Sequence, residues 1–200
     1  MLPDNSWYGH RRIFLEYLGL RDQKIFGALQ HGWRSQISDV TPNKKKYFYR
    51  ILVWTKNQRN FYLKKKNYNV FSIGAPFLYL CKILETKKSV AKIKDETKNR
   101  VLVFPAHSSQ GFGHKTDHKL LIKKIKKEFK GQYTVCFYYY DLNKEDINLY
   151  KKNNWNIVCC VKNKTDQLSL FKIYNEINNH DVIISTEFSS SLFYGMFSEV

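Results

Sequence analysis

The second half of the chain alternates four times between strand-like and helix-like patterns, and this alternation most limits what the chain can fold into. Apolar runs typical of buried strands occupy residues 100–105, 133–140, 155–161 and 181–185. Apolar residues at helical spacing occupy 119–130, 143–152 and 166–178, and a last helical pattern begins near residue 190. Strand and helix in alternation, at a spacing of roughly 25–30 residues, predict a parallel sheet flanked by helices.

The first half repeats this pattern less completely. Helical patterns cover 8–18, 56–66 and 77–84, and strand patterns cover 24–30, 50–54 and 70–73. The segment 85–100 is charged and poor in apolar residues, which is typical of a linker. We therefore expect an α/β fold of two Rossmann-like units, 1–90 and 91–200, with a cleft between them. The chain opens into a helix and stops where another strand would follow, so we expect a fragment with an incomplete first unit and a truncated second unit.

Residue types at the ends of the expected helices indicate where each helix begins and ends. Thr116 or Asp117 is expected to cap the helix at 119–130, and Asn143 to cap the next one. Gly131 stands where glycine commonly ends a helix.

The metal-binding residue types do not form a strong pattern. The four cysteines include no C-x-x-C pair, so we expect free thiols in a reducing compartment. His114 and His118 lie near Asp117 but lack a third well-placed ligand, so we expect no metal and no resident cofactor.

The chain is strongly basic, with 34 Lys and Arg residues against 17 Asp and Glu and a formal net charge of +17. Such a charge suits nucleic acid, an anionic membrane surface or a phosphorylated substrate. Abundant Lys, Asn, Ile, Tyr and Phe also fit A/T-rich coding DNA, in which case much of the charge needs no partner. Nucleic acid is the less favoured partner because aromatic-rich basic motifs are absent. No apolar run approaches the roughly 20 residues of a membrane span, and no signal-peptide pattern is present, so a cytoplasmic location is expected.

Polar clusters follow the ends of three predicted strands, where parallel sheets bind ligands. In the first cluster, Gly32 lets the backbone approach a ligand, His31 can accept a proton, and Arg34 can bind phosphate or carboxylate. The alternative for His31 is a packed imidazole that is bonded to a backbone carbonyl.

The second cluster, His107, Ser108, Ser109 and Gly111, forms a small-residue loop that could line a pocket. It matches neither the dinucleotide fingerprint nor the phosphate-binding P-loop, and an ordinary flexible loop is the alternative.

The third cluster contains Thr186, Glu187, Ser189 and Ser190 between a strand and a helix. Helix N-termini present unpaired N–H groups and partial positive charge, so hydroxyls beside them can help to hold phosphate or sugar oxygens. The alternative is that Thr186 or Ser189 only caps the helix.

These clusters together resemble a known enzyme family. His31-Gly32 is similar to the His-Gly loop of the CDP-glycerol glycerophosphotransferases of teichoic acid and capsule synthesis. The segment 186–190 resembles their Thr-Asp-Tyr-Ser-Ser motif, with Glu187 and Phe188 as departures. Gly74-Ala-Pro76 resembles their Gly-x-Pro, and the loop at 105–108 takes the place of the first loop of the second domain.

The resemblance implies a GT-B fold and a nucleotide-activated donor, without a bound metal. His31 would serve as base toward an acceptor hydroxyl, and Thr186, Ser189 and Ser190 would bind the donor diphosphate. Glu187 is one methylene longer than Asp and would shift the donor. A surface-polysaccharide or lipid-linked acceptor is implied, with the surface lysines holding the protein at the inner face of an anionic membrane. We therefore expect a polysaccharide-biosynthesis glycosyltransferase that uses a nucleotide sugar or CDP-polyol. A sugar-nucleotide epimerase of the same fold and an inactive truncated remnant remain alternatives.

Overall fold

The computed structural model describes residues 5–30, 32–33, 50–64, 69–85, 99–108, 113 and 116–198. Most of the expected linker at 85–100 lies outside the described residues. The chain divides into two units, residues 1–88 with 164–170 and residues 89–163 with 171–200. Each unit has a parallel sheet with helices, so the α/β class and the parallel sheets are confirmed.

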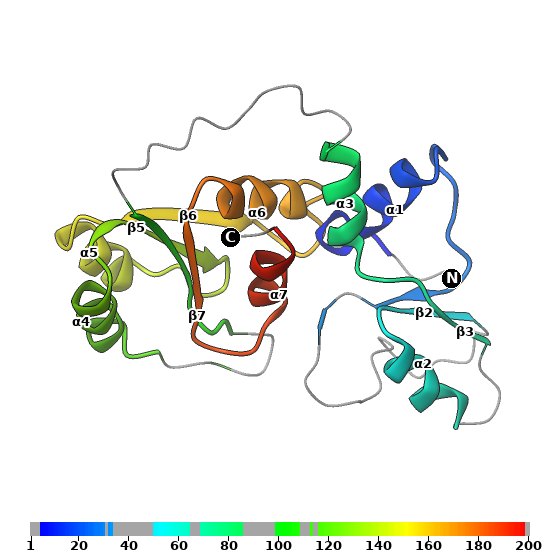
Figure 1. Ribbon diagram of the computed structural model, residues 1–200, viewed down its shortest axis with the longest axis horizontal. Coiled ribbons are helices and arrows are strands. Elements are labelled where there is room, and N and C mark those ends of the chain that lie inside the picture. Colours follow the sequence, from blue (N-terminus) through cyan, green and yellow to red (C-terminus); the bar gives the residue numbers. More distant parts are fainter. Residues whose placement is uncertain are drawn as a thin grey trace. The chain divides into compact units, whose positions relative to one another are not determined.

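The first unit contains three parallel strands in the order β1-β2-β3 (Figure 1). The strands are β1 (Ala28–Leu29), β2 (Arg50–Val53) and β3 (Asn69–Ser72). A 3-10 turn, η1 (Trp7–Gly9), precedes α1 (His10–Tyr17), and the other helices are α2 (Lys56–Leu63) and α3 (Pro76–Glu85). The core between sheet and α2 is formed by Ile51, Val53, Tyr62 and Val70.

Strand β1 is shorter than the strand predicted at 24–30, and a side chain pairs with the backbone along the edge that faces away from β2. The Asn5 amide donates to the carbonyl of Gly27 at 2.9 Å and accepts from the N–H of Leu29 at 3.0 Å. Asn5 is buried and supplies both a donor and an acceptor, much as a neighbouring strand would. Such pairing by a distant side chain leaves no signal in the local pattern at 24–30.

The second unit contains four parallel strands in the order β6-β5-β4-β7 (Figure 1). These strands are β4 (Asn99–Phe104), β5 (Gly131–Tyr138), β6 (Asn156–Val161) and β7 (Val182–Ser185). Strands β4 to β6 are added outward in chain order, and β7 then returns to pair with the other side of β4. The direction of winding thus reverses between β4 and β7, which makes this pair the topological switch point of the sheet.

Helices cover both faces of the second sheet. They are α4 (His118–Glu128), α5 (Lys144–Lys152), α6 (Ser169–Asn178) and α7 (Ser190–Phe197). On one face α4 and α5 pack against alternate strand residues, in a core formed by Val101, Val103, Ile122, Ile125, Val135, Phe137, Tyr150 and Trp155. On the other face His180, which follows α6, lies 2.8 Å from the Thr134 hydroxyl of β5, and Gly195 of α7 packs closely on Ile183.

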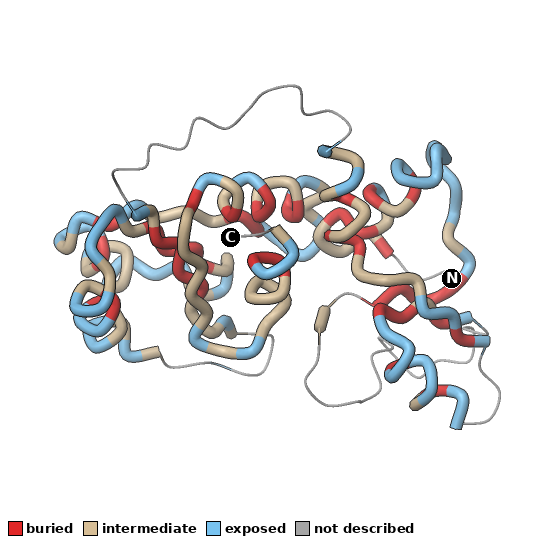
Figure 2. Tube along the Cα trace, viewed as in Figure 1, coloured by how far each residue is buried: buried red, intermediate tan, exposed pale blue. Residues whose placement is uncertain are grey.

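Burial falls from the centre of this sheet toward β7. Four residues of β4 and four of β5 are buried, whereas all four residues of β7 are half-buried (Figure 2). The apolar run at 181–185 suggests a fully buried strand, but β7 stands at the end of the strand order. Within the described residues it has a paired neighbour on one side only, which leaves its side chains partly exposed.

Two of the predicted helix caps are confirmed and one predicted helix end is wrong. Asp117 accepts from the N–H of Leu120 at 2.9 Å, and Asn143 accepts from the N–H of Asp146 at 2.9 Å. Gly131 does not end α4, because it is the first residue of β5 and pairs with Asn99. A Cβ at Gly131 would lie 1.8 Å from the Asn99 carbonyl oxygen, so glycine at this position allows β4 and β5 to pack closely.

The four cysteines are free thiols, as predicted. Cys136 and Cys160 are buried on neighbouring strands. A hydrogen bond with Cys136, together with burial, raises the pKa of the Cys160 thiol far above its usual range. Cys160 is therefore protonated at neutral pH and has little nucleophilic thiolate.

Within the described ranges, no helix is both long enough and apolar enough to cross a membrane.

Candidate functional site

Three loops meet at the carboxyl edge of the second sheet. They follow β4, β5 and β7, and because all four strands are parallel, their C-terminal ends lie at one edge. Open α/β sheets bind ligands at this edge, next to the switch point. Two of the three predicted polar clusters lie in the loops after β4 and β7.

Thr186 joins the loops that follow β4 and β7. Its N–H donates to the carbonyl of Phe104 at 3.1 Å, and its hydroxyl accepts from the N–H of Ala106 at 2.7 Å. The structure thus brings together two segments that lie 80 residues apart in the chain. At the opposite end of the same strand pair, the Asp181 carboxylate accepts from the backbone N–H of Arg100 at 2.9 Å and from its guanidinium at 3.2 Å. Polar bonds therefore hold β7 to β4 at both ends.

The turn between β7 and α7 is held by its own hydroxyl groups. The Ser185 hydroxyl donates to the carbonyl of Glu187 at 2.7 Å and lies 3.2 Å from the Ser189 hydroxyl. Ser189 occupies the N-cap position of α7, but its side chain makes no capping hydrogen bond. The alternative in which Thr186 or Ser189 only caps this helix is therefore wrong, since the Thr186 hydroxyl bonds Ala106 instead. Ser190, the first helical residue, is half-buried.

The loop after β4 is fixed by Asp141, which follows β5. Both carboxylate oxygens of Asp141 accept from the N–H of Ser108 at 3.1 Å. The exposed His107 ring packs on Tyr138, with ring centroids 4.6 Å apart. Ser109 and Gly111, which the sequence analysis also proposed, lie outside the described residues.

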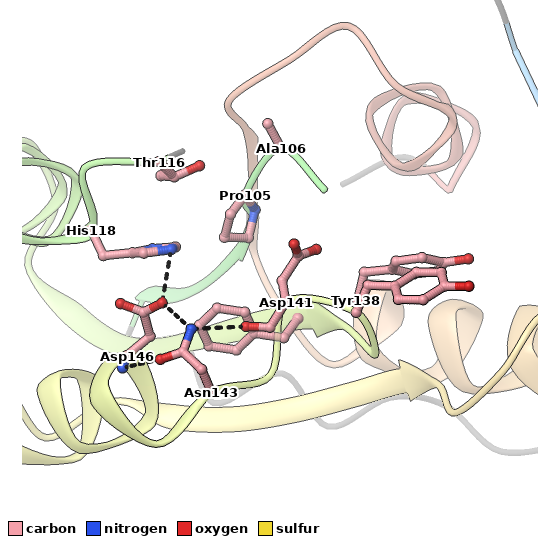
Figure 3. A pocket seen from close by; sticks show the side chains of 10 residues that line it. Pro105, Ala106, Thr116, His118, Tyr138, Asp141, Asn143 and Asp146 are labelled. Atoms are coloured by element: carbon pink, nitrogen blue, oxygen red, sulfur yellow. Dashed lines mark hydrogen bonds and ion pairs between the residues drawn. The ribbon is translucent and has the colours of Figure 1, made fainter. Parts of the chain in front are cut away.

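A pocket of about 170 Å³ lies between the ends of β4 and β5 (Figure 3). Its walls are formed by Pro105, Ala106, Thr116, His118, Phe137, Tyr138, Tyr140, Asp141, Asn143 and Asp146. Pockets for drug-sized molecules usually measure about 300–1,000 Å³. The described walls therefore enclose room for one chemical group of a larger ligand.

His118 and Asp146 form a polar pair in this pocket. The Nε2 atom of His118 lies 3.6 Å from an Asp146 carboxylate oxygen, and its Nδ1 atom lies 3.0 Å from the Tyr150 hydroxyl. Burial, with a smaller contribution from the Asp146 charge, raises the pKa of Tyr150 well above its usual value, so this phenol remains protonated. The same Asp146 oxygen accepts from the Asn143 amide at 2.5 Å.

Sequence reasoning missed this pair because its members lie on different helices. His118 stands at the start of α4 and Asp146 in the first turn of α5. The local signal at Asn143 and Asp146 indicates only a helix start. That this helix start faces His118 depends on how α4 and α5 pack on the same sheet face.

The third predicted cluster lies in the first unit and is only partly described. His31 and Arg34 lie outside the described residues. The Gly32 carbonyl accepts from the Gln30 amide at 2.8 Å. Gln30 is buried, and its side-chain and backbone oxygens accept from the backbone and indole N–H groups of Trp54 at 2.9 Å each. The carboxyl end of β1 is therefore fastened to the end of β2.

The second unit's edge thus combines a helix N-terminus that the Ser189 side chain does not cap, several hydroxyls and an acidic pocket. No three His, Cys, Asp or Glu side chains gather as a metal-ligand group in the part of the chain that the structure describes. No protein-family model matches this chain, and no match was found among curated proteins or among solved structures.

Proposed function

We propose that this chain belongs to a GT-B-type transferase that moves a sugar or glycerophosphate from a nucleotide-activated donor to a surface-polysaccharide or lipid-linked acceptor. The observation that carries the proposal is the bond from the Ala106 N–H to the Thr186 hydroxyl at 2.7 Å. It places the small-residue loop after β4 beside the hydroxyl-rich start of α7, at the switch point of a parallel sheet.

The start of α7 supports binding of the donor's phosphates. Ser189, the N-cap residue of α7, makes no capping hydrogen bond with its side chain, so this side chain does not occupy the first-turn N–H groups. These groups and the helix dipole favour a negative charge, and the neighbouring hydroxyls can donate further hydrogen bonds. The same groups would stabilise the charge that develops on the leaving phosphate.

The proposed reaction is a direct displacement. The acceptor oxygen forms a bond to the anomeric carbon of a sugar donor, or to the phosphorus of a glycerophosphate donor. The bond from that atom to the nucleotide's phosphate oxygen breaks, and its electron pair leaves with the nucleotide. The family resemblance assigns the acceptor's proton to His31, through general base catalysis.

A thermal-shift screen against CDP-, CMP-, UDP- and GDP-linked donors tests donor binding. A donor at about 100 times its dissociation constant is expected to stabilise the fold by about 2.7 kcal/mol, because it binds only the folded state. A shift with donors of one base and not with the others would support the proposal and identify the donor class.

A matched variant separates the proposed site from general charge effects. Thr186→Val is expected to reduce the shift, because it removes a hydroxyl from the proposed phosphate site. Lys124→Gln is the control, since Lys124 is exposed on α4 and should leave the shift unchanged. A folded protein that no donor stabilises would contradict the proposal. Conversion of the donor without any acceptor would favour the epimerase alternative.

A further inference from the structure

The pocket between the ends of β4 and β5 differs in charge from the rest of this basic chain. Asp141 and Asp146 line it, and no Lys or Arg is among its described walls, although 34 of the 200 residues are Lys or Arg. Figure 3 shows that the Asp141 carboxylate lies apart from the His118–Asp146 pair. Thr116 and Pro105 also line the pocket. A phosphate would meet two carboxylates here and no fixed cation, so the pocket disfavours an anion.

The polar atoms in this pocket retain capacity for hydrogen bonds. The two Asp141 oxygens share one N–H donor, that of Ser108, and each has lone pairs left. One oxygen of Asp146 makes no hydrogen bond to a described residue, while the other accepts from Asn143. The 3.6 Å separation between His118 Nε2 and Asp146 is too long for a hydrogen bond, so Nε2 can still bond a ligand.

We infer that this pocket binds an uncharged group with neighbouring hydroxyls. Carboxylates accept from hydroxyl donors, and His118 Nε2 adds a third polar atom from a separate element. The aromatic rings of Phe137, Tyr138 and Tyr140 in the wall supply apolar surface for the carbon skeleton of a sugar or polyol.

This inference rests on the proposed function and adds an orientation to it. Ala106 lines the pocket and also donates its N–H to Thr186, so one residue belongs to both parts of the site. The donor's phosphates lie toward α7, and a hydroxyl-bearing part of the same molecule enters the acidic pocket. That part is either the ribose of the nucleotide or the sugar or polyol that is transferred.

Proton NMR of the His118 ring gives a local test that needs no transferase activity. The ring signal is assigned by its loss in His118→Asn and is followed during titration with cytidine, 2′,3′-dideoxycytidine, glycerol, glucose and inorganic phosphate. At least one hydroxyl-bearing probe is expected to shift the signal, and inorganic phosphate is not. Cytidine acting without glycerol or glucose would identify the ribose, and the reverse would identify the transferred group.

Isosteric variants test the two carboxylates. Asp141→Asn and Asp146→Asn are each expected to weaken binding of the active probe about tenfold or more, because a hydrogen bond to a charged group is lost. Glu145→Gln is the matched control, since Glu145 is exposed on the same helix turn and does not line the pocket. 2′,3′-Dideoxycytidine lacks the ribose hydroxyls, so its comparison with cytidine tests the ribose hydrogen bonds on the unaltered protein. This part of the test does not depend on whether the variants fold.

The outcomes separate this inference from the proposed function. If none of the hydroxyl-bearing probes, cytidine included, shifts the His118 signal, or if inorganic phosphate shifts it in their place, the inference is wrong. If a polyol binds here but no nucleotide-linked donor stabilises the protein, the pocket assignment stands and the transferase proposal fails. If donors stabilise the protein and both Asp→Asn variants bind them as tightly as the unaltered chain, the transferase proposal stands and the pocket assignment fails.

Discussion

At the scale of single residues, Thr186 has the widest structural role in the candidate site. Its N–H bonds to Phe104 at the end of β4 and its hydroxyl to Ala106 in the following loop, so it fixes the distance between the two loops. Its side chain is exposed, so it contributes through this hydrogen bond and not through burial in the core. A methyl group in place of the hydroxyl would keep the shape of the side chain and remove the acceptor.

Thr186→Val is therefore expected to lower the free energy of unfolding by about 1 kcal/mol, because the Ala106 N–H loses its partner. Thr186→Ser keeps the hydroxyl and is expected to stay closer to the unaltered chain. Urea unfolding followed by circular dichroism measures both values. Equal stability of the Val and Ser variants would show that this bond does not hold the two loops together.

At the scale of elements, the register between β4 and β5 depends on one close backbone contact. Gly131 pairs with Asn99, and a Cβ at Gly131 would lie 1.8 Å from the Asn99 carbonyl oxygen. The neighbouring atom belongs to the backbone and cannot move aside as a flexible side chain would. The two strands carry the loops with Ser108 and Asp141, so this register also sets the position of the pocket walls.

Gly131→Ala is expected to destabilise the protein by about 1–3 kcal/mol, since β4 and β5 must separate to admit the methyl group. Gly113→Ala is the control, because a Cβ there meets nothing within 4 Å and should change stability by less than about 0.5 kcal/mol. Urea unfolding midpoints compare the two variants. A Gly131→Ala protein as stable as the control would mean that the strands tolerate a wider spacing.

At the scale of the whole molecule, the net charge of +17 is the dominant property, and it is carried in part by α4. Lys123, Lys124 and Lys127 are exposed on this helix, while Ile122 and Ile125 are buried against the sheet. These lysines form a solvent-exposed face of α4. An exposed basic face also suits the anionic surface of a membrane, where each lysine contributes about 1 kcal/mol.

Cosedimentation with lipid vesicles tests this membrane role. Vesicles that contain anionic lipid are expected to bind the protein at low salt and to release it at high salt, because salt screens the attraction. Lys123→Gln with Lys127→Gln should weaken this binding about tenfold or more. Comparable binding to neutral phosphatidylcholine vesicles would contradict an electrostatic mechanism.

Much of the second unit could be predicted from the sequence because its signals are local. Apolar runs and helical spacing identified β4 to β7 and the helices between them, and the side chains of Asp117 and Asn143 identified two helix starts. Gly131 was misread because a glycine after a helix resembles an end signal, and only the pairing with Asn99 reveals its strand role. The pairing of Asn5 with β1 could not be predicted because the two lie in distant segments of the chain.

The α/β class, the parallel sheets and the polar residues after β4 and β7 could be read from the sequence, since each follows from periodicity and residue type within short windows. The pairing of β7 with β4, the bond of Thr186 to Ala106 and the approach of His118 to Asp146 appear only in the folded chain. Strand order and helix packing are chosen by contacts between residues far apart in the chain. A local pattern indicates that a side chain is polar and lies at a strand end, but not which partner it meets there.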